Sequence, residues 1–256
     1  MKMKTQSLVN AAVAGVLGLS MAGAANATVV FGDGGTALQG VLDGITNATP
    51  ANPSGNSSVN VVTDQFSPDQ TWAITGSGGS ISTLIIELAG FANGNSFGVY
   101  DLANPANSVQ IFSGAQGAGA QGSLAILADG SVVVNFADTG VDFASGNAFG
   151  FYLNVSDTGN RWHSNTALNI DGLDHMAAYQ GNDSDVIQIP PFSAGVWTSS
   201  EYVLAWEDLH ASVSDLDYTD FVVIVESVKP IPEPGILALL GLGLLGMVGG
   251  RRFTKA

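Results

Sequence analysis

Residues 202–226 read YVLAWEDLHASVSDLDYTDFVVIVE, and this stretch decides the architecture of the chain. Two apolar runs, residues 202–206 and 221–228, flank a polar loop. Both runs are rich in β-branched and aromatic residues and are too short for a core helix, which favours strands. The stretch therefore predicts two neighbouring strands joined by an acidic loop.

Similar short apolar runs recur along the rest of the chain between turn residues. The further predicted strands are residues 59–66, 81–88, 96–100, 109–112, 124–128, 131–136, 149–155, 176–179 and 186–189. Asp129-Gly130 predicts a hairpin with a type I′ turn, and Asn93-Gly94 marks a second turn. Residues 48–58 predict an exposed loop, and residues 41–46 a short helix. Many short strands and so little helix predict an all-β fold, a single β-sandwich or jelly-roll-like domain.

The acidic loop is the strongest candidate for a binding site. Asp215-x-Asp217-x-x-Asp220 gathers three carboxylates within six residues, and calcium takes six to eight oxygen ligands in proteins. The spacing is not that of an EF-hand. Upstream, Asp171 and Asp174 can join the site if the two loops meet. The predicted ligands of Ca²⁺ are Glu207, Asp208, Asp215, Asp217, Asp220, Asp171 and Asp174. The alternative is that these aspartates cap turns by accepting backbone hydrogen bonds.

Other patterns point to chemistry only weakly. His163, His175 and His210 are too dispersed for a zinc site. The glycines of residues 114–122 precede a strand, whereas a dinucleotide-binding loop opens a helix. No Gly-x-Ser-x-Gly elbow is present. We therefore predict no enzymatic activity, with a polysaccharide-active enzyme as the most remote alternative because two facing carboxylates are all that a glycosidase requires.

Aromatic residues leave a carbohydrate-binding module as an alternative. Trp162 and Trp197 can stack on sugar rings if they are exposed. Trp206 occupies an apolar strand position, so we expect it in the core.

The two termini read as targeting signals. Lys2 and Lys4 precede an apolar stretch that closes with Ala25-Asn26-Ala27, which predicts a signal peptide over residues 1–27 with cleavage after Ala27. At the other end, residues 231–256 form a tail with a rigid tripeptide, an uncharged run at 236–250 and a basic cluster. That run predicts a single, short transmembrane helix with its cations on the cytoplasmic side.

The charge of the exported part restricts its partners. Residues 28–230 hold 21 Asp and Glu side chains against Arg161 and Lys229, a net charge of −19. Such a surface repels nucleic acids and acidic polysaccharides unless cations mediate. The chain also has no cysteine, so the domain relies on its core or on metal.

The tail resembles a PEP-CTERM sorting signal. The resemblance lies in Pro232, Glu233 and Pro234, in the Gly- and Leu-rich run, and in Arg251 and Arg252. It implies a Gram-negative bacterium, a transient membrane anchor, and an exosortase-type transpeptidase that removes the tail near Pro-Glu-Pro. It also implies a mature protein at the cell surface or in the extracellular matrix, with extracellular polysaccharide as a partner.

Residues 149–228 also resemble a domain of uncharacterised function in bacterial surface proteins. The matching positions are Asn169, Asp171, Asp174, His175, Glu207, Asp208, Leu209, Asp215, Asp217, Tyr218, Asp220 and Phe221. The chain departs from that pattern at residues 211–213, where glycines are common, and at Thr219, where Asn is usual. The resemblance implies a β-sandwich-like adhesive or matrix module without a known reaction.

Overall fold

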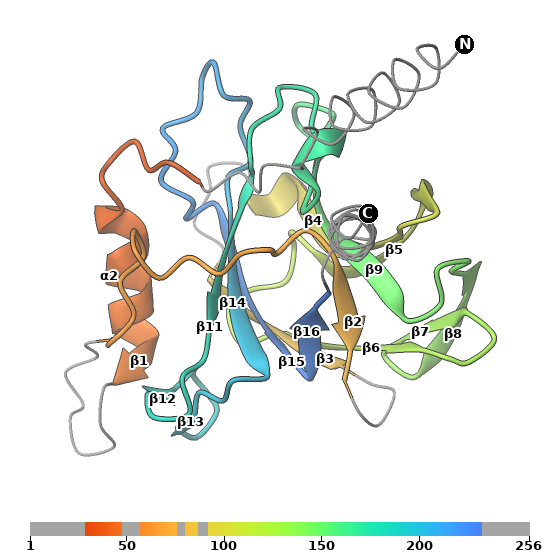
Figure 1. The fold of residues 1–256 in the computed structure, drawn as a ribbon, viewed down its shortest axis with the longest axis horizontal. Helices are drawn as coiled ribbons and strands as arrows, with labels where there is room; N and C mark the ends of the chain where they lie inside the picture. Colours follow the sequence, from red (N-terminus) through yellow and green to blue (C-terminus); the bar gives the residue numbers. More distant parts are fainter. Residues whose placement is uncertain (1–28, 48–56, 76–79, 87–91, 232–256) are drawn as a thin grey trace, which may run out of the picture. The chain divides into compact units, whose positions relative to one another are not determined.

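The computed structural model describes residues 29–47, 57–75, 80–86 and 92–231 (Figure 1). The predicted signal peptide, the tail from Pro232 onward with its predicted membrane span, and most of the predicted loop at 48–58 lie outside these residues. Within the described ranges, no helix combines the length and the apolar character needed to cross a membrane.

Two large antiparallel sheets make up most of the described part of the chain (Figure 1). The seven-stranded sheet has the order β11-β14-β15-β3-β6-β7-β8. Its strands are β3 (Ser80–Ile86), β6 (Gln121–Ile126), β7 (Ser131–Val134), β8 (Ala137–Asp142), β11 (Met176–Gln180), β14 (Glu201–Trp206) and β15 (Phe221–Glu226).

The six-stranded sheet follows the path β16-β2-β9-β4-β5, and β10 also pairs with β9. Its strands are β2 (Trp72–Ile74), β4 (Asn95–Asp101), β5 (Asn104–Ser113), β9 (Ala148–Val155), β10 (Asn160–His163) and β16 (Val228–Pro230). The remaining elements are the helix α2 (Thr36–Ile45), a small sheet of β1 (Thr46–Asn47), β12 (Val186–Ile187) and β13 (Gly195–Val196), and the 3₁₀ turns Ala92–Gly94 and Thr166–Leu168.

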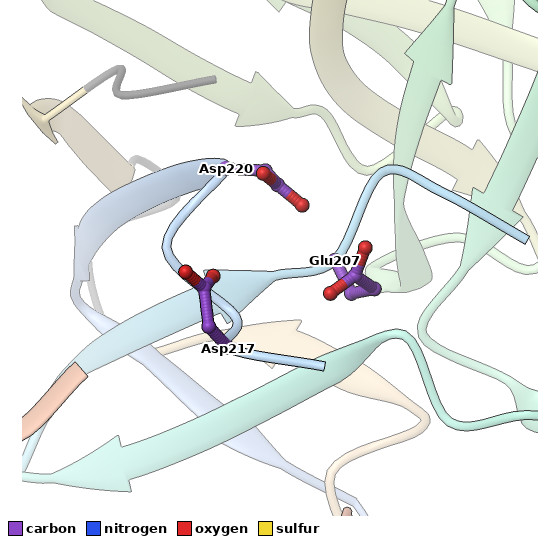
Figure 2. Close-up of side chains that lie close together, drawn as sticks. All are labelled: Glu207, Asp217 and Asp220. Atoms are coloured by element: carbon purple, nitrogen blue, oxygen red, sulfur yellow. The ribbon is translucent and has the colours of Figure 1, made fainter. Parts of the chain in front are cut away.

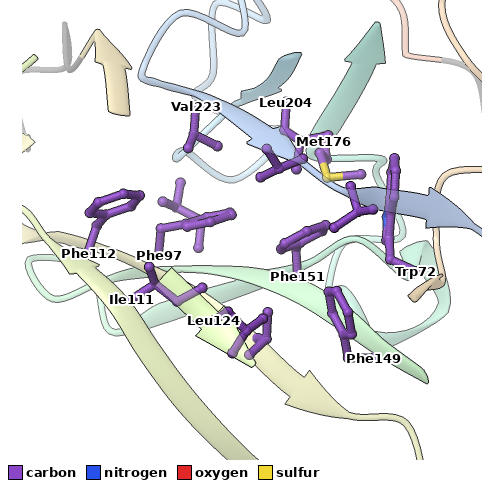
Figure 3. Packing of buried hydrophobic residues seen from close by; sticks show 14 of the residues in the cluster. Trp72, Phe97, Ile111, Phe112, Leu124, Phe149, Phe151, Met176, Leu204 and Val223 are labelled. Carbon is purple, nitrogen blue, oxygen red and sulfur yellow. The ribbon is translucent and has the colours of Figure 1, made fainter. Parts of the chain in front are cut away.

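The core lies between the two large sheets and is rich in aromatic rings (Figure 3). Phe97 on β4 stacks on Phe151 of its own sheet, with ring centroids 5.4 Å apart. It also contacts Trp206 and Phe221 of the opposite sheet, at 6.1 and 5.6 Å. These contacts, made by side chains from both sheets, define a β-sandwich-like all-β fold, as the sequence predicted.

The seven-stranded sheet is also covered on its other face. Alternate residues of β14 and β15, such as Val203 and Val222, pack in a second cluster with α2. The helix is amphipathic and buries Leu38, Val41, Leu42 and Ile45. Burial on both faces explains why β14 and β15 are apolar runs without the alternation of a half-exposed strand.

The predicted strand at 59–66 is wrong, because polar side chains fold this segment into a turn. Asn60 Oδ1 accepts hydrogen bonds from the N–H groups of Val62 and Thr63, at 2.9 and 3.1 Å. The Asn60 N–H donates to Asp64 Oδ2 at 2.9 Å. Val59 and Val61 are nevertheless buried in the second cluster, so the apolar alternation reflects burial without strand pairing.

The predicted strand at 221–228 is two strands in two sheets. Ser227 has φ 58°, a left-handed conformation that ends β15 and directs the chain into β16. β15 pairs with β14 and β3, whereas β16 pairs with β2 of the other sheet. The segment thus crosses from one layer of the sandwich to the other.

Turns and element ends also differ from prediction. Asp129-Gly130 does join β6 and β7, but only Gly130 has positive φ there, so the turn is not type I′. The two positive φ angles that type I′ requires occur at Asn135 and Phe136, which end β7 at Val134. The predicted helix at 41–46 begins earlier, at Thr36, after Asp33 accepts hydrogen bonds from the N–H groups of Gly35 and Ala37.

We predict that Phe97→Ala lowers the free energy of unfolding by about 3–5 kcal/mol, because it leaves a cavity where both sheets meet. Phe136→Ala is the matched control, since Phe136 is 95% exposed, and it should change stability by less than about 0.5 kcal/mol. Urea denaturation measures both values. Equal effects of the two substitutions would contradict the assigned core.

Candidate functional site

Three carboxylates lie close together where β14 ends beside the start of β15. Trp206 and Phe221 are paired in register, so the loop between them begins and ends at one edge of the sandwich. Glu207 follows β14, whereas Asp217 and Asp220 precede β15. One ligand atom of each lies within 4.8 Å of the others, and Figure 2 shows the three side chains together. We call Glu207, Asp217 and Asp220 the carboxylate cluster.

Backbone geometry fixes Asp217 in this cluster. Its neighbours Leu216 and Tyr218 both have positive φ, at 58° and 57°. The buried Tyr218 side chain holds the loop inward by donating to the Asp174 carbonyl at 2.6 Å. The Thr219 N–H and hydroxyl both donate to Asp217 Oδ1, at 2.8 and 2.9 Å. The aspartate therefore partly caps its own turn, as the alternative interpretation of the sequence expects.

Glu207 is the least satisfied member of the cluster. Its side chain is fully buried, Oε1 accepts a hydrogen bond from the N–H of Leu209 at 3.1 Å, and the Ser214 and Asp220 side chains are further hydrogen-bonding neighbours of the carboxyl group. Oε2 is buried without a hydrogen-bond partner. An unpartnered buried carboxylate oxygen is costly, and turn capping does not account for it. A cation between the three carboxylates would satisfy that atom.

Electrostatics within the cluster point the same way. Burial, followed by the negative charge of Glu207, raises the pKa of Asp220 to about 9. Burial also raises the pKa of Glu207 and of Asp208. Among the residues that the structure describes, the basic side chain in salt-bridge contact with a carboxylate is His175, beside Asp171, and burial lowers its pKa, so no Lys or Arg neutralises the cluster. These carboxylates are therefore mutually repulsive when ionised.

Asp208 lies outside the carboxylate cluster and makes contacts of its own. Its carboxylate accepts a hydrogen bond from Asn95 Nδ2 at 3.0 Å, and its N–H donates to Asp220 Oδ2 at 2.8 Å. Its carbonyl accepts from Trp162 Nε1 at 2.7 Å. Asn95 and Trp162 belong to the six-stranded sheet, so Asp208 connects the loop to the opposite layer. Sequence reasoning missed both partners as supports of the site because no local pattern links residues this far apart.

Asp171 and Asp174 lie outside the cluster. Asp171 accepts hydrogen bonds from the Ala211 N–H at 3.0 Å and from His175 Nε2 at 3.1 Å. His175 is itself fully buried and stacks on Trp162, with ring centroids 3.6 Å apart. The two loops thus meet as expected, through the hydrogen bond from Ala211 to Asp171 and through that between His175 Nδ1 and the Glu207 carbonyl at 2.8 Å, and not through shared ligand atoms.

Asp174 is buried beside a second carboxyl, that of Asp69. Burial raises the pKa of Asp174 to about 7. Burial and the charge of Asp174 raise the pKa of Asp69 well above its usual value. Asp215, the last predicted ligand, is exposed and outside the cluster. The structure thus brings together three of the seven predicted ligands.

Comparison with known protein families identifies the PEP-CTERM protein-sorting motif at residues 230–252. This confirms the interpretation of Pro232-Glu233-Pro234 and Arg251-Arg252 as a sorting signal. The motif implies export, sorting to the cell surface and processing by an exosortase. It covers the end of the chain and not the sandwich, so the resemblance of residues 149–228 to a surface domain stays a prediction. Comparison with curated proteins found no match.

The Asp69–Asp174 pair predicts how stability depends on pH. The folded-state pKa of Asp174, about 7, lies above its usual value of 3.8, so the folded protein binds this proton more tightly than the unfolded chain. The resulting stabilisation is fully present below the usual value and is lost as pH rises through about 7. We expect the urea midpoint to fall over this interval with calcium chelated. The fall should be smaller in Asp174→Asn, which is neutral throughout.

The exposed Asp157 provides the control. Asp157→Asn should leave the pH dependence unchanged. A slope in Asp174→Asn that equals the wild-type slope would show that this carboxyl is not the titrating group.

Proposed function

We propose that this chain is a non-enzymatic surface or extracellular-matrix protein of a Gram-negative bacterium, associated with exopolysaccharide or biofilm. The observation that carries the proposal is the sorting motif at residues 230–252, which follows directly on the last strand of the sandwich. The exported part is thus a β-sandwich-like unit that is complete before the signal begins. Removal of the tail near Pro232–Pro234 leaves β16 intact.

We further propose that calcium stabilises this unit at the carboxylate cluster. Glu207, Asp217 and Asp220 supply carboxylate oxygens, the ligands that hard cations prefer. The buried Oε2 atom of Glu207 has no other partner. Asp217 and Asp220 are partly exposed, which leaves a route for the ion and room for water as a further ligand. The ion would also offset the repulsion that raises the pKa of Asp220.

The side chains give less support to the two alternative functions, a carbohydrate-binding module and a polysaccharide-active enzyme. A sugar-stacking platform requires exposed rings, but all four tryptophans and all five tyrosines of the chain are buried. An enzyme acting on polysaccharides requires two carboxylates that face each other across a cleft. The cavity of about 390 Å³ between α2 and residues 60–62 is lined by a single carboxylate, that of Asp43.

Calcium should raise the melting temperature, because a ligand that binds only the folded state adds stability. The gain is about 2.7 kcal/mol when calcium exceeds its Kd a hundredfold. Asp217→Asn, Asp220→Asn and Glu207→Gln should each abolish the shift, whereas the exposed Asp215→Asn should keep it. Differential scanning calorimetry in millimolar calcium and in chelator measures the shift. A melting temperature that calcium does not move would remove the metal from the proposal.

The same substitutions separate metal binding from a purely structural role of the aspartates. With a pKa of about 9, Asp220 is protonated and neutral at pH 7 when no ion is bound, so Asp220→Asn keeps the charge of the cluster and in chelator should melt close to the wild-type temperature. A variant that melts far lower in chelator would indicate that Asp220 serves the fold and not an ion.

Processing can be tested on the protein recovered from the cell surface or the medium. Mass spectrometry should find a chain that starts at Thr28 and ends between Pro232 and Pro234. Replacing Pro232 and Pro234 with Ala should leave the tail attached, since exosortase recognition depends on this tripeptide. An exported wild-type chain that still carries Lys255 would contradict the assignment.

A further inference from the structure

Exposed aliphatic side chains gather on the segments around the carboxylate cluster. Nine large hydrophobic residues are exposed in the described part of the chain, and four of them lie on three short segments, residues 29–32, 166–173 and 209–216. These four are Val30, Leu168, Ile170 and Val213. Ile170 and Val213 are 77% and 69% exposed. Scattered surface hydrophobics need no explanation, but a grouping beside a candidate ion site does.

Backbone hydrogen bonds join the three segments into one surface, which we call the loop face. The Ala211 N–H donates to Asp171 Oδ2 at 3.0 Å, which connects the segments of Val213 and Ile170. The Gly32 N–H donates to the Leu216 carbonyl at 3.0 Å, which adds the segment of Val30. All three segments lie at the end of the sandwich where β14 finishes and β15 begins (Figure 1).

The charge of the loop face is one-sided. Its segments contain no Lys or Arg, and the partly exposed Asp217 and Asp220 lie next to the exposed Asp215. An anionic partner is therefore repelled unless a cation bridges the two surfaces. Three protein carboxylates leave positions open in the six to eight ligands of calcium, and an outside phosphate oxygen can fill one of them. Aliphatic side chains beside such an ion favour a partner that is both anionic and apolar.

If the run at 236–250 spans the membrane as the sequence predicts, a lipid surface lies within reach of the sandwich. Four residues, 232–235, separate Ile231 from the uncharged run at 236–250. At full extension they span about 14 Å. A chain whose tail is still attached to the membrane is therefore confined to the neighbourhood of that membrane, which raises the effective concentration of lipid headgroups at its surface.

We propose that the loop face docks on an anionic lipid surface while the tail is still attached, through a calcium ion shared between the carboxylate cluster and a lipid phosphate. Ile170 and Val213 enter the headgroup region on either side of the ion. This rests on the calcium binding proposed above. Removal of the tail then leaves a weak, calcium-dependent contact, so that the mature protein is released.

Site-directed fluorescence tests the docking in the tail-bearing chain. Because the sequence has no cysteine, Val213→Cys introduces one labelling site, and Leu127→Cys on the hairpin between β6 and β7 is the exposed control. Each labelled chain is reconstituted into vesicles of equal parts phosphatidylcholine and phosphatidylglycerol that contain nitroxide-labelled lipid. Calcium should increase quenching at position 213 and not at position 127. The increase should be lost in phosphatidylcholine alone, and in Val213→Cys combined with Glu207→Gln.

The outcomes separate this proposal from the calcium site itself. Equal quenching at positions 213 and 127, in a protein whose melting temperature calcium still raises, would overturn the docking and leave the site. No effect of calcium on either property would overturn both. Displacement of the quenching by soluble polyuronate, or calcium-dependent binding to polyuronate without quenching, would assign the loop face to an acidic polysaccharide and overturn the lipid proposal.

Discussion

The described fold depends on the burial of β14 and β15 between two apolar layers. One face of this strand pair packs on the aromatic core around Phe97, and the other packs on α2 and its neighbouring loops. A strand pair covered on both sides has little freedom to shift its register, because a slip by one residue exchanges the contents of both layers. The loop that joins the two strands is therefore held at both ends by rigid structure. The positions of Glu207 and Asp220 follow from this constraint.

Because the chain is so acidic, burying Glu207 in that rigid loop costs free energy. Glu207 is buried away from water, and no basic side chain is paired with it. A domain with a net charge of −19 and only two cationic side chains has few internal ways to neutralise buried acids. Hydrogen bonds satisfy some of the carboxylate oxygens in this region: Asn95 donates to Asp208, Leu209 to Glu207 and Thr219 to Asp217. The calcium ion proposed above would satisfy the remaining carboxylate oxygen.

Local patterns predicted those features that local physics controls. Strand pairs such as β14 and β15 could be predicted because short apolar runs rarely form anything but buried strands. The cluster could be predicted in part because Asp217 and Asp220 are close in sequence. The turn at Asn60 was missed because burial of Val59 and Val61 produces the same alternation as a strand. The break at Ser227 was missed because a left-handed serine leaves no signal in the sequence.

Contacts between residues that are far apart in the sequence could not be predicted either. Asp171 and Asp174 were expected beside the other acids, but hydrogen bonds from Ala211 and His175 hold Asp171 elsewhere, and one from the Met176 N–H holds Asp174. Nothing in the neighbourhood of Asn95 or Trp162 indicates that they support a loop more than forty residues away. Such contacts depend on which strands the topology brings together, and one sequence does not contain that information.

The pairing of β2 with β16 and of β3 with β15 constrains when this protein folds. Each pair joins one of the earliest described strands to one of the last, across well over a hundred residues. The seven-stranded sheet is not complete until the chain has emerged as far as Glu226, and the six-stranded sheet not until Pro230, shortly before the uncharged run at 236–250. Such long-range pairing slows folding, so the chain can be threaded through a secretion channel as an unfolded polymer. A chain truncated before residue 221 lacks both β15 and β16, so it exposes the unpaired edges that β14, β3 and β2 otherwise share with them.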